Sequence, residues 1–528
     1  METLTLTAGF VGLALVVLFA LANKAPSGKE HYWFDDEIKA LGTPRNGPKH
    51  RKVVICGSGI GGLVGARMCL DHFEEVVLVD PEFSKTLGGS IKSRIMQYYS
   101  IHGYVILFAQ GIRALWPNFD EKADAAGQAK YNGDFGIYLD GQPMRTWAPG
   151  RQPPYSLNMR RQMLEPFLHN MLMNETPESK RLTIIDGTIR GMKGDKATNK
   201  IVAVDGKRVS GGDFEITDFD LIIDSTGRAQ CGVKWLEEAG FDAPKRSGYV
   251  PNIRYTTIHI PVTDEVWNSV VPEKHRNGAI SVCADPFDPA QLPLLGSSSG
   301  KFDNGYALLC LGSRTGPGLL PKKAEEIVPA IKSIFHSTSA PEWLTTLWTT
   351  VLANGDPEFY NANLGACTIT EYDKVKSLPS NFIAIGDATM IVNPLYGQGC
   401  GKVMIGLLLL DQMLRKTAPR QFSPTFGQEF FKGLKVRTAG LWDTSKFADY
   451  GYPYTEPCEG ETLQVGNFER KMSKIFMYAA LEDEQIAHEL GLIRHLLSSG
   501  SALMKPNMVA RVIVAHMKRA GRSLIGGK

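Results

Sequence analysis

Short apolar runs alternate with a helical stretch near the start of the chain, which is typical of a parallel α/β sheet. Lys52–Cys56 reads KVVIC and Glu75–Asp80 reads EVVLVD, and both have the length and β-branched content of buried strands. Residues 63–73 between them have helical character. The apolar runs Leu221–Ile223 and Phe382–Ile385 predict two further buried strands. We therefore predict an α/β fold with a Rossmann-like sheet.

Two later regions follow different patterns. Residues 249–262 alternate in the manner of a strand and Tyr306–Leu311 is another apolar run, so we expect a second β-sheet in the middle of the chain. Residues 419–528 are mostly helical in pattern. After Pro506, apolar residues recur at helical spacing beside several Arg and Lys residues. This predicts a basic amphipathic helix that either lies on an anionic bilayer or docks on the protein core.

The N-terminus carries an uncharged apolar run, Leu4–Ala22, that has the length of a membrane span. As a helix its 19 residues would extend about 28 Å, close to the thickness of the hydrocarbon layer. A cleaved signal peptide, which needs basic residues before the run, and a buried core helix are the alternatives. Basic residues follow the run and none precedes it, so the positive-inside rule places the body in the cytosol, at the endoplasmic reticulum in a eukaryote. We expect a single transmembrane helix over residues 4–23 and a linker over residues 24–49.

The composition of the 528-residue chain limits the classes of function. It is 43% hydrophobic and 21% charged, which is ordinary for globular proteins and excludes a disordered or collagen-like chain. The 58 Lys and Arg against 55 Asp and Glu leave a net charge of +3, so no nucleic-acid partner is expected. The eight cysteines form no C-x-x-C pair, so we expect reduced thiols and no metal site.

The first chemical motif is a glycine-rich turn between the first predicted strand and helix. Gly57, Gly59 and Gly62 form the pattern G-x-G-x-x-G. The first glycine permits a tight turn, the second lets the backbone approach a pyrophosphate, and the third lets the helix pack against the strand. Asp80 stands 18 residues beyond Gly62, where its carboxylate can accept a hydrogen bond from a ribose hydroxyl. The motif predicts a dinucleotide site without distinguishing NAD from FAD.

A second loop, residues 386–399, lies far along the chain and has related properties. Gly386 and Asp387 end a predicted strand, and Pro394, Gly397 and Gly399 belong to a turn (PLYGQG) before a helix. Asp387 can bind a ribitol hydroxyl or reach the diphosphate through water. Backbone N–H groups at the helix start can stabilise negative charge on the N1–C2=O edge of a flavin. An NAD dehydrogenase needs no such second loop, so the pair favours FAD.

Two further segments complete an ordered set of motifs. Arg161 stands at the head of a predicted helix, and Asp224 opens the turn DSTGR after a short strand. Together with the glycine turn and the second loop, these motifs resemble the single-component FAD monooxygenases related to aromatic hydroxylases and squalene epoxidases, with flavin halogenases as relatives. The resemblance covers roughly residues 50–415. It implies an FAD-binding domain, made of residues 50–135, 155–245 and 378–418. A β-sheet substrate domain, residues 136–154 and 246–377, is interleaved with it. A helical C-terminal region, residues 419–528, follows.

The resemblance also implies a reaction. In the family, reduced FAD reacts with O₂ to give a C4a-hydroperoxide, which delivers oxygen to the substrate. We therefore expect an FAD-dependent monooxygenase that hydroxylates or epoxidises a lipophilic small molecule in secondary metabolism. NADPH is the expected electron donor, and a separate flavin reductase is the alternative source of electrons. A flavin halogenase-like enzyme, for which Lys92 is the candidate lysine, and an FAD-dependent reductase or dehydrogenase of isoprenoid double bonds are the alternative functions.

Three residues are candidates for chemistry beside the flavin. Arg94 and His102 follow Gly88 and Gly89, where the family's flavin loop begins. The resemblance implies that Arg94 pairs with the diphosphate or lies over the flavin, and that His102 faces the ring. Tyr396 lies inside the second loop and would line the substrate cavity. Each of the three also has a simpler interpretation as a packing or structural residue.

Overall fold

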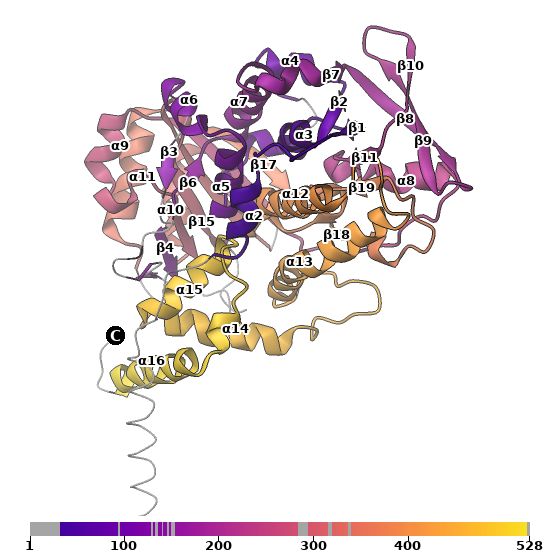
Figure 1. Cartoon of the computed structure of the whole chain (residues 1–528). Coiled ribbons are helices and arrows are strands. Elements are labelled where there is room, and N and C mark those ends of the chain that lie inside the picture. Colours follow the sequence, from indigo (N-terminus) through magenta and orange to yellow (C-terminus); the bar gives the residue numbers. More distant parts are fainter. Residues whose placement is uncertain are drawn as a thin grey trace, which may run out of the picture.

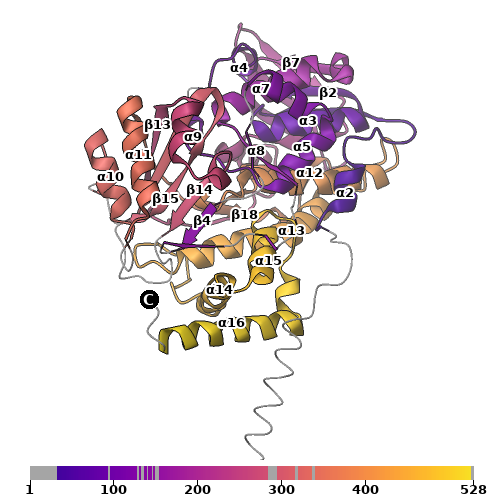
Figure 2. The same cartoon turned by 90° about the vertical axis from the view of Figure 1, so that its left-hand side faces the viewer.

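Two main β-sheets lie side by side, each with covering helices, and C-terminal helices run along one side of the molecule (Figures 1 and 2). The structure is a computed structural model. It describes residues 32–92, 95–127, 130–132, 136–139, 141–144, 147–148, 151, 154–283, 294–314, 319–335 and 339–524.

The structure does not support the predicted membrane anchor. In the described ranges, no helix is both long and apolar enough to cross a bilayer. The three longest, α12 (Gly399–Lys416), α13 (Phe426–Asp449) and α16 (Pro506–Leu524), carry charged side chains along their lengths and pack against the protein. The predicted span, residues 4–23, lies outside the described residues. We therefore withdraw the single-pass anchor and the membrane location derived from it.

The first sheet is parallel and provides the switch point at which α/β sheets bind ligands. Its strand order is β19 (Phe382–Ala384), β11 (Leu221–Asp224), β1 (His50–Cys56), β2 (Phe73–Val79) and β7 (Leu182–Ile185). The last four residues of β1 and of β2 are buried, which explains their nearly continuous apolar sequences. The chain runs from β1 to β2 on one side and later returns to β11 on the other. The strand order therefore reverses beside β1, and a ligand site is expected at the carboxyl ends there.

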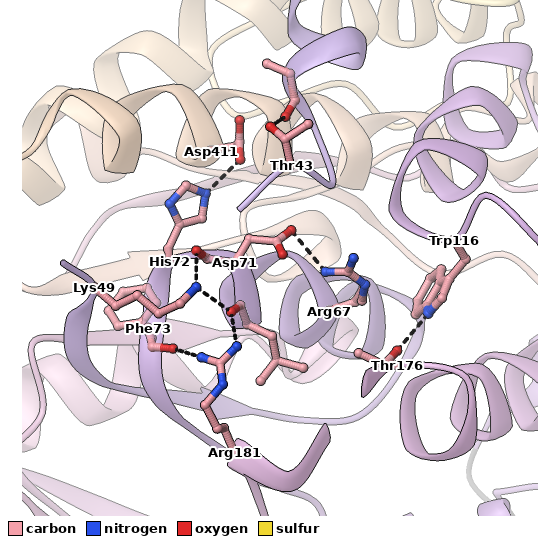
Figure 3. A network of polar contacts seen from close by, with 12 residues as sticks. Thr43, Lys49, Arg67, Asp71, His72, Phe73, Trp116, Thr176, Arg181 and Asp411 are labelled. Atoms are coloured by element: carbon pink, nitrogen blue, oxygen red, sulfur yellow. Dashed lines mark hydrogen bonds and ion pairs between the residues drawn. The ribbon is translucent and has the colours of Figure 1, made fainter. Parts of the chain in front are cut away.

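The helix α3 (Ile60–His72), which crosses from β1 to β2, is held firmly at its C-terminal end (Figure 3). Lys49 Nζ and Arg181 Nη2 both donate hydrogen bonds to the Leu70 carbonyl oxygen, at 3.1 and 2.8 Å. Cations at this end are favourable because the last carbonyls of a helix are unpaired and carry partial negative charge. His72 Nε2 lies 2.7 Å from Asp411 Oδ1 of α12, and both side chains are buried. The C-terminal end of α3 is thereby fixed relative to the sheet and to α12.

The second sheet has a helix-covered face and a face directed at a cavity. Its order is β17 (Glu358–Asn363), β13 (Arg254–Pro261), β16 (Tyr306–Ser313), β15 (Leu294–Lys301), β14 (Ile280–Cys283), β4 (Gly136–Leu139) and β5 (Gln142–Pro143). The helices α9 (Asp264–Val270), α10 (Ala324–Lys332) and α11 (Glu342–Asn354) lie on its outer side (Figures 1 and 2). Leu309 and Leu311 join the core under these helices, whereas Cys310 and Gly312 line the cavity. This alternation follows from the two-residue period of a strand.

The C-terminal helices form a layer beside both sheets (Figures 1 and 2). α14 (Asn467–Ala480), α15 (Glu484–Arg494) and α16 contact one another. Met508, Val512 and Ala515 of α16 are buried in a core shared with α14 and α15. The basic helix predicted after Pro506 therefore docks on the protein.

Further helices and three small sheets complete the described fold. The helices are α2 (Asp35–Ala40), α4 (Phe83–Leu87), α5 (Ile106–Leu115), α6 (Phe119–Ala125), α7 (Arg161–Asn174) and α8 (Cys231–Glu238). Small sheets are formed by β8 (Gly187–Asp195), β9 (Lys200–Arg208) and β10 (Asp213–Thr217), by β12 (Arg246–Tyr249), β18 (Cys367–Thr370) and β20 (Met390–Ile391), and by β3 (Lys130–Asn132) and β6 (Ser156–Asn158).

Candidate functional site

The glycine turn lies at the switch point, where β1 and β11 end side by side. Gly57 has a φ of +103°, and a Cβ on it would lie 2.6 Å from the Ser225 carbonyl oxygen. A Cβ on Gly62 would lie 1.8 Å from the Gly57 carbonyl oxygen, so α3 can approach β1 this closely only without a side chain there. A Cβ on Gly59 would meet nothing within 4 Å, and Gly59 lines the main cavity. The N-terminus of α3 borders the same cavity and is open to an anionic group.

Asp80 closes the turn from the end of β2. Its Oδ2 accepts a hydrogen bond from the Ser58 N–H at 2.8 Å, and its Oδ1 accepts one from the Glu82 N–H at 2.8 Å. Burial alone would raise the pKa of Asp80, but Lys92 and the two N–H groups outweigh it and lower the pKa. The carboxylate is thus ionised, lines the cavity and retains lone pairs for a further donor.

A buried ionic network underlies this end of the cavity. Lys92 Nζ donates to the Ser58 carbonyl oxygen at 2.9 Å and lies 3.3 Å from Glu165 Oε1. Arg161 Nε donates to Glu165 Oε2 at 3.0 Å, and Arg161 Nη1 donates to Gln97 Oε1. Burial would raise the pKa of Glu165, but Arg161 and Lys92 lower it. Arg161, at the first turn of α7, is therefore fixed at the cavity wall, while Glu165 is a residue that the sequence motifs did not indicate.

Asp224 shapes the turn after β11 from below. It is fully buried and does not line the cavity. Its Oδ1 accepts from the Thr226 N–H at 2.9 Å, and its Oδ2 accepts from the Gly232 N–H at 2.8 Å. Burial raises the pKa of Asp224. The neighbouring Ser225 and Thr226 reach the cavity in its place, so Asp224 positions the turn that faces the cavity.

The second loop begins beside β19 at the same edge of the sheet. Gly386 has a φ of +65°, and both Gly386 and Asp387 line the cavity. Lys402 Nζ, from α12, donates to Asp387 Oδ1 at 2.8 Å and also to the Met390 carbonyl oxygen. Burial would raise the pKa of Asp387, but Lys402 outweighs it and lowers the pKa. Asp387 is therefore an ionised hydrogen-bond acceptor at the cavity wall.

The rest of the second loop leads directly into α12. Asn393 Oδ1 accepts from the Leu395 N–H at 3.0 Å and caps the short turn. Gly397 has a φ of +66°, a left-handed conformation that favours glycine. Pro394, Gly397 and Gly399 all line the cavity, and α12 begins at Gly399. The positive end of an 18-residue helix thus opens toward the cavity.

Asp449, the last residue of α13, ties the second loop to the second sheet. Its carboxylate accepts hydrogen bonds from Asn393 Nδ2 at 3.0 Å, from the Tyr396 hydroxyl at 3.1 Å and from the Tyr249 hydroxyl at 2.9 Å. Arg314 Nη2 also donates a hydrogen bond to this carboxylate, at 2.7 Å from Asp449 Oδ1. The sequence indicates no chemistry in the helical region after residue 419, because nothing about a single carboxylate near a helix end reveals four distant partners.

The residues expected beside the ring fall into three cases. His102 lines the cavity, and its Nδ1 lies 2.8 Å from the Ser100 carbonyl oxygen, which makes Nδ1 the protonated nitrogen and leaves Nε2 as an acceptor. Burial, with Arg161 nearby, lowers the pKa of His102 to about 4, so the ring is neutral at pH 7. Tyr396 lines the cavity and donates to Asp449. Arg94 lies outside the described residues.

A single cavity of about 2150 Å³ joins the glycine turn, the second loop and the inner face of the second sheet. It exceeds the roughly 300–1,000 Å³ of a typical small-molecule site. The cavity therefore has room for an extended dinucleotide together with a second molecule. Its walls combine the ionic groups at the carboxyl ends of the first sheet with small residues of the second sheet, such as Ser297 and Cys310.

The fold is that of the flavoproteins that include FAD-dependent monooxygenases and flavin-dependent halogenases. Among solved structures, a flavoprotein/dehydrogenase from Cytophaga hutchinsonii is similar with a TM-score of 0.58 and 11% identity, covering 89% of this chain and 100% of that one. The p-nitrophenol 4-monooxygenase PnpA from Pseudomonas putida is similar with a TM-score of 0.54 and 14% sequence identity, and the match covers 86% of this chain and 100% of that one. The flavin-dependent brominase Bmp2 is similar with a TM-score of 0.53 and 12% sequence identity, and the match covers 89% of this chain and 100% of that one.

Sequence comparison finds weaker similarity than the comparison of structures. The chain is 24% identical over 377 residues to Protein Rv3254 of Mycobacterium tuberculosis, which covers 67% of this chain and 70% of that protein. No protein-family model matches the chain.

Proposed function

We propose that the protein is an FAD-dependent monooxygenase that oxidises a lipophilic small molecule. The observation that carries the proposal is the meeting of the glycine turn and the second loop at one cavity, in a fold shared with flavoproteins. The glycine turn would bind the diphosphate through the N–H groups of α3, and Asp80 would accept from the ribose of the adenosine half. Asp387 would bind the ribityl chain or the diphosphate.

The protein's own part in the chemistry is to hold and polarise the ring. When bound, FAD supplies the redox chemistry and the reaction with O₂. The N-terminus of α12 would lie at the pyrimidine edge of the ring, where its N–H groups stabilise negative charge on the reduced form. The neutral His102 offers Nε2 as an acceptor at pH 7.

The position of Lys92 favours a monooxygenase over a halogenase-like enzyme. A halogenase needs a lysine between the flavin and the substrate. Lys92 Nζ is instead engaged by Ser58, Asp80 and Glu165 beneath the glycine turn.

The test uses the full chain loaded with FAD under argon. Addition of NADPH should bleach the flavin absorbance band, and admission of air should then consume O₂, coupled to an oxygenated product when a substrate is present. A reduced product formed without O₂ uptake would instead indicate a reductase or dehydrogenase of double bonds, and a halide-dependent product would indicate a halogenase. Flavin that is bleached only when a flavin reductase is added would assign the electron supply to that partner.

A further inference from the structure

Arg314 is a buried cation at the cavity wall whose donors are mostly unused. It follows the last residue of β16, its side chain is 2% exposed, and it lines the cavity. Nη2 donates to Asp449 Oδ1 at 2.7 Å, and the guanidinium carbon lies 3.5 Å above the centre of the Tyr452 ring. Within the described part of the chain, Nε and Nη1 have no hydrogen-bond partner. Nε carries one N–H group and Nη1 carries two.

Such an arrangement is unfavourable unless something else accepts these N–H groups. A buried donor without an acceptor loses its hydration and gains nothing in return, and the loss is larger when the group is charged. Asp449 balances the charge only in part, because Asn393, Tyr396 and Tyr249 share the same carboxylate. Burial would lower the pKa of Arg314, but Asp449 outweighs it, so the guanidinium stays charged. The site thus places a permanent positive charge at the cavity wall, together with buried N–H groups that no described residue accepts.

The surroundings of Arg314 suit a molecule that is acidic at one end and apolar elsewhere. Leu364 and Val392 belong to the buried cluster that contains Tyr249, the hydrogen-bond donor to Asp449, and both line the cavity. Tyr396 of the second loop shares the Asp449 carboxylate with Arg314. A ligand oxygen at Arg314 would therefore be held close to the loop that precedes α12.

We propose that Arg314 binds an anionic oxygen of the substrate, so that the substrate is a lipophilic carboxylic acid or a similarly acidic molecule. This proposal rests on the function proposed above, since it names the class of substrate for the same cavity. Arg314 acts as the specificity-determining residue, and Asp449 is the positioning residue that holds one edge of its guanidinium.

The test compares two probes of the same shape, 2-naphthoate and the neutral 2-naphthamide, titrated into the FAD-loaded full chain by calorimetry and by the change in flavin absorbance. A hydrogen bond to a charged group contributes about 1.5–3 kcal/mol, so naphthoate should bind at least about tenfold more tightly than naphthamide. Arg314→Met should abolish this preference, and Arg314→Lys should retain part of it. The double variant Arg314→Met/Asp449→Asn removes the unpaired carboxylate and should also lack the preference if the single variant folds poorly.

Arg470→Met is the matched control. Arg470 also lines the cavity, but its Nη1 and Nη2 already donate to the carbonyl oxygens of Phe447, Val465 and Leu463. This variant should keep the preference for naphthoate. Equal affinities of the wild-type protein for the two probes, or a preference that survives Arg314→Met, would overturn the proposal. Calorimetry reads this preference whether or not the flavin is present, so failure of the proposal is distinguishable from failure to bind FAD.

Discussion

The two ends of the cavity are built in different ways. At the glycine turn the ligand-facing surface is backbone, and the requirement at each position is the absence of a side chain or a positive φ, as at Gly57 and Gly62. At the other end, which we propose binds the substrate, the surface is made by side chains from separate segments. Arg314, after β16, and Tyr396, in the second loop, line the cavity, and Asp449 of α13 bonds both of them. The first end is encoded in one short stretch of sequence, whereas the second exists only once the chain has folded.

Because of this difference, the two ends of the cavity should tolerate amino-acid substitutions to different degrees. Gly57 and Gly62 of the turn accept no side chain without a clash with the backbone, and a turn of this kind would bind any dinucleotide diphosphate in much the same way. The side-chain group at the substrate end can change by single substitutions while the sheet remains intact. We therefore expect cofactor binding to depend on the first end and substrate choice on the second.

The largest effect is expected from glycine substitutions in the turn. Gly62→Ala places a Cβ 1.8 Å from a backbone oxygen, so the protein should lose both FAD and thermal stability. Gly59→Ala meets no protein atom within 4 Å, so the apoprotein should melt at the wild-type temperature, yet bind FAD at least about tenfold more weakly because the methyl group occupies the path of the diphosphate. FAD content and melting temperature measure both. Equal behaviour of the two variants would contradict the assignment of the turn.

Low pH is expected to destabilise the whole fold, and with it both ends of the cavity. Burial lowers the pKa of His102, His169, His259 and His275 to about 4 from the ordinary 6.5. Between these values the unfolded chain binds more protons than the folded protein, so stability is lost as the pH falls from about 6.5 toward 4. Each histidine contributes up to about 1.4 kcal/mol per pH unit. Urea unfolding at pH 7, 6 and 5 should show a steep decline, and a flat profile would contradict the burial of these rings.

A smaller but still large effect is expected at Asp449. Asp449→Ala leaves the Arg314 guanidinium buried without its counter-ion and removes the acceptor for Asn393 and Tyr396. Breaking a buried ion pair in this way costs about 3–5 kcal/mol of unfolding free energy. The exposed Asp213→Ala, whose side chain lies 3.9 Å from Arg190, serves as the control and should change stability by less than about 1 kcal/mol. Chemical denaturation compares them, and similar losses in both would refute a special role for Asp449.

The smallest effect is expected from Tyr396→Phe. This change removes one hydrogen bond to Asp449 and leaves the ring in place, which should cost about 1 kcal/mol. FAD content should be unaltered, because the N–H groups at the start of α12 are backbone. If Tyr396→Phe instead empties the protein of FAD, the division between the two ends does not hold.

The sequence predicts the first end well because its signals are local. The strand expected at Lys52–Cys56 is observed as β1, His50–Cys56, and the one at Glu75–Asp80 as β2, Phe73–Val79. The runs at Leu221 and Phe382 likewise appear as β11 and β19. Short apolar runs bounded by glycine and acidic residues define these strands without any tertiary information.

The rest was beyond prediction for physical reasons. Asp224 looks like a ligand residue in sequence, but folding turns its carboxylate inward to the Thr226 and Gly232 N–H groups. Arg314 and Asp449 are 135 positions apart, and their pairing exists only once the end of α13 and the residue after β16 have come together in the fold. The apolar run at residues 4–23 suggests a membrane span on hydropathy alone, and in the described ranges no helix has the length and apolarity to serve as one.

The measurement that tests the central claim most directly is the FAD content of the full-length protein. The chain, purified after incubation with excess FAD and freed of unbound ligand, should retain one flavin per chain with a structured absorption spectrum, and Gly59→Ala should retain much less. A wild-type chain that folds with a cooperative melting transition yet holds no flavin would contradict the assignment of the cavity.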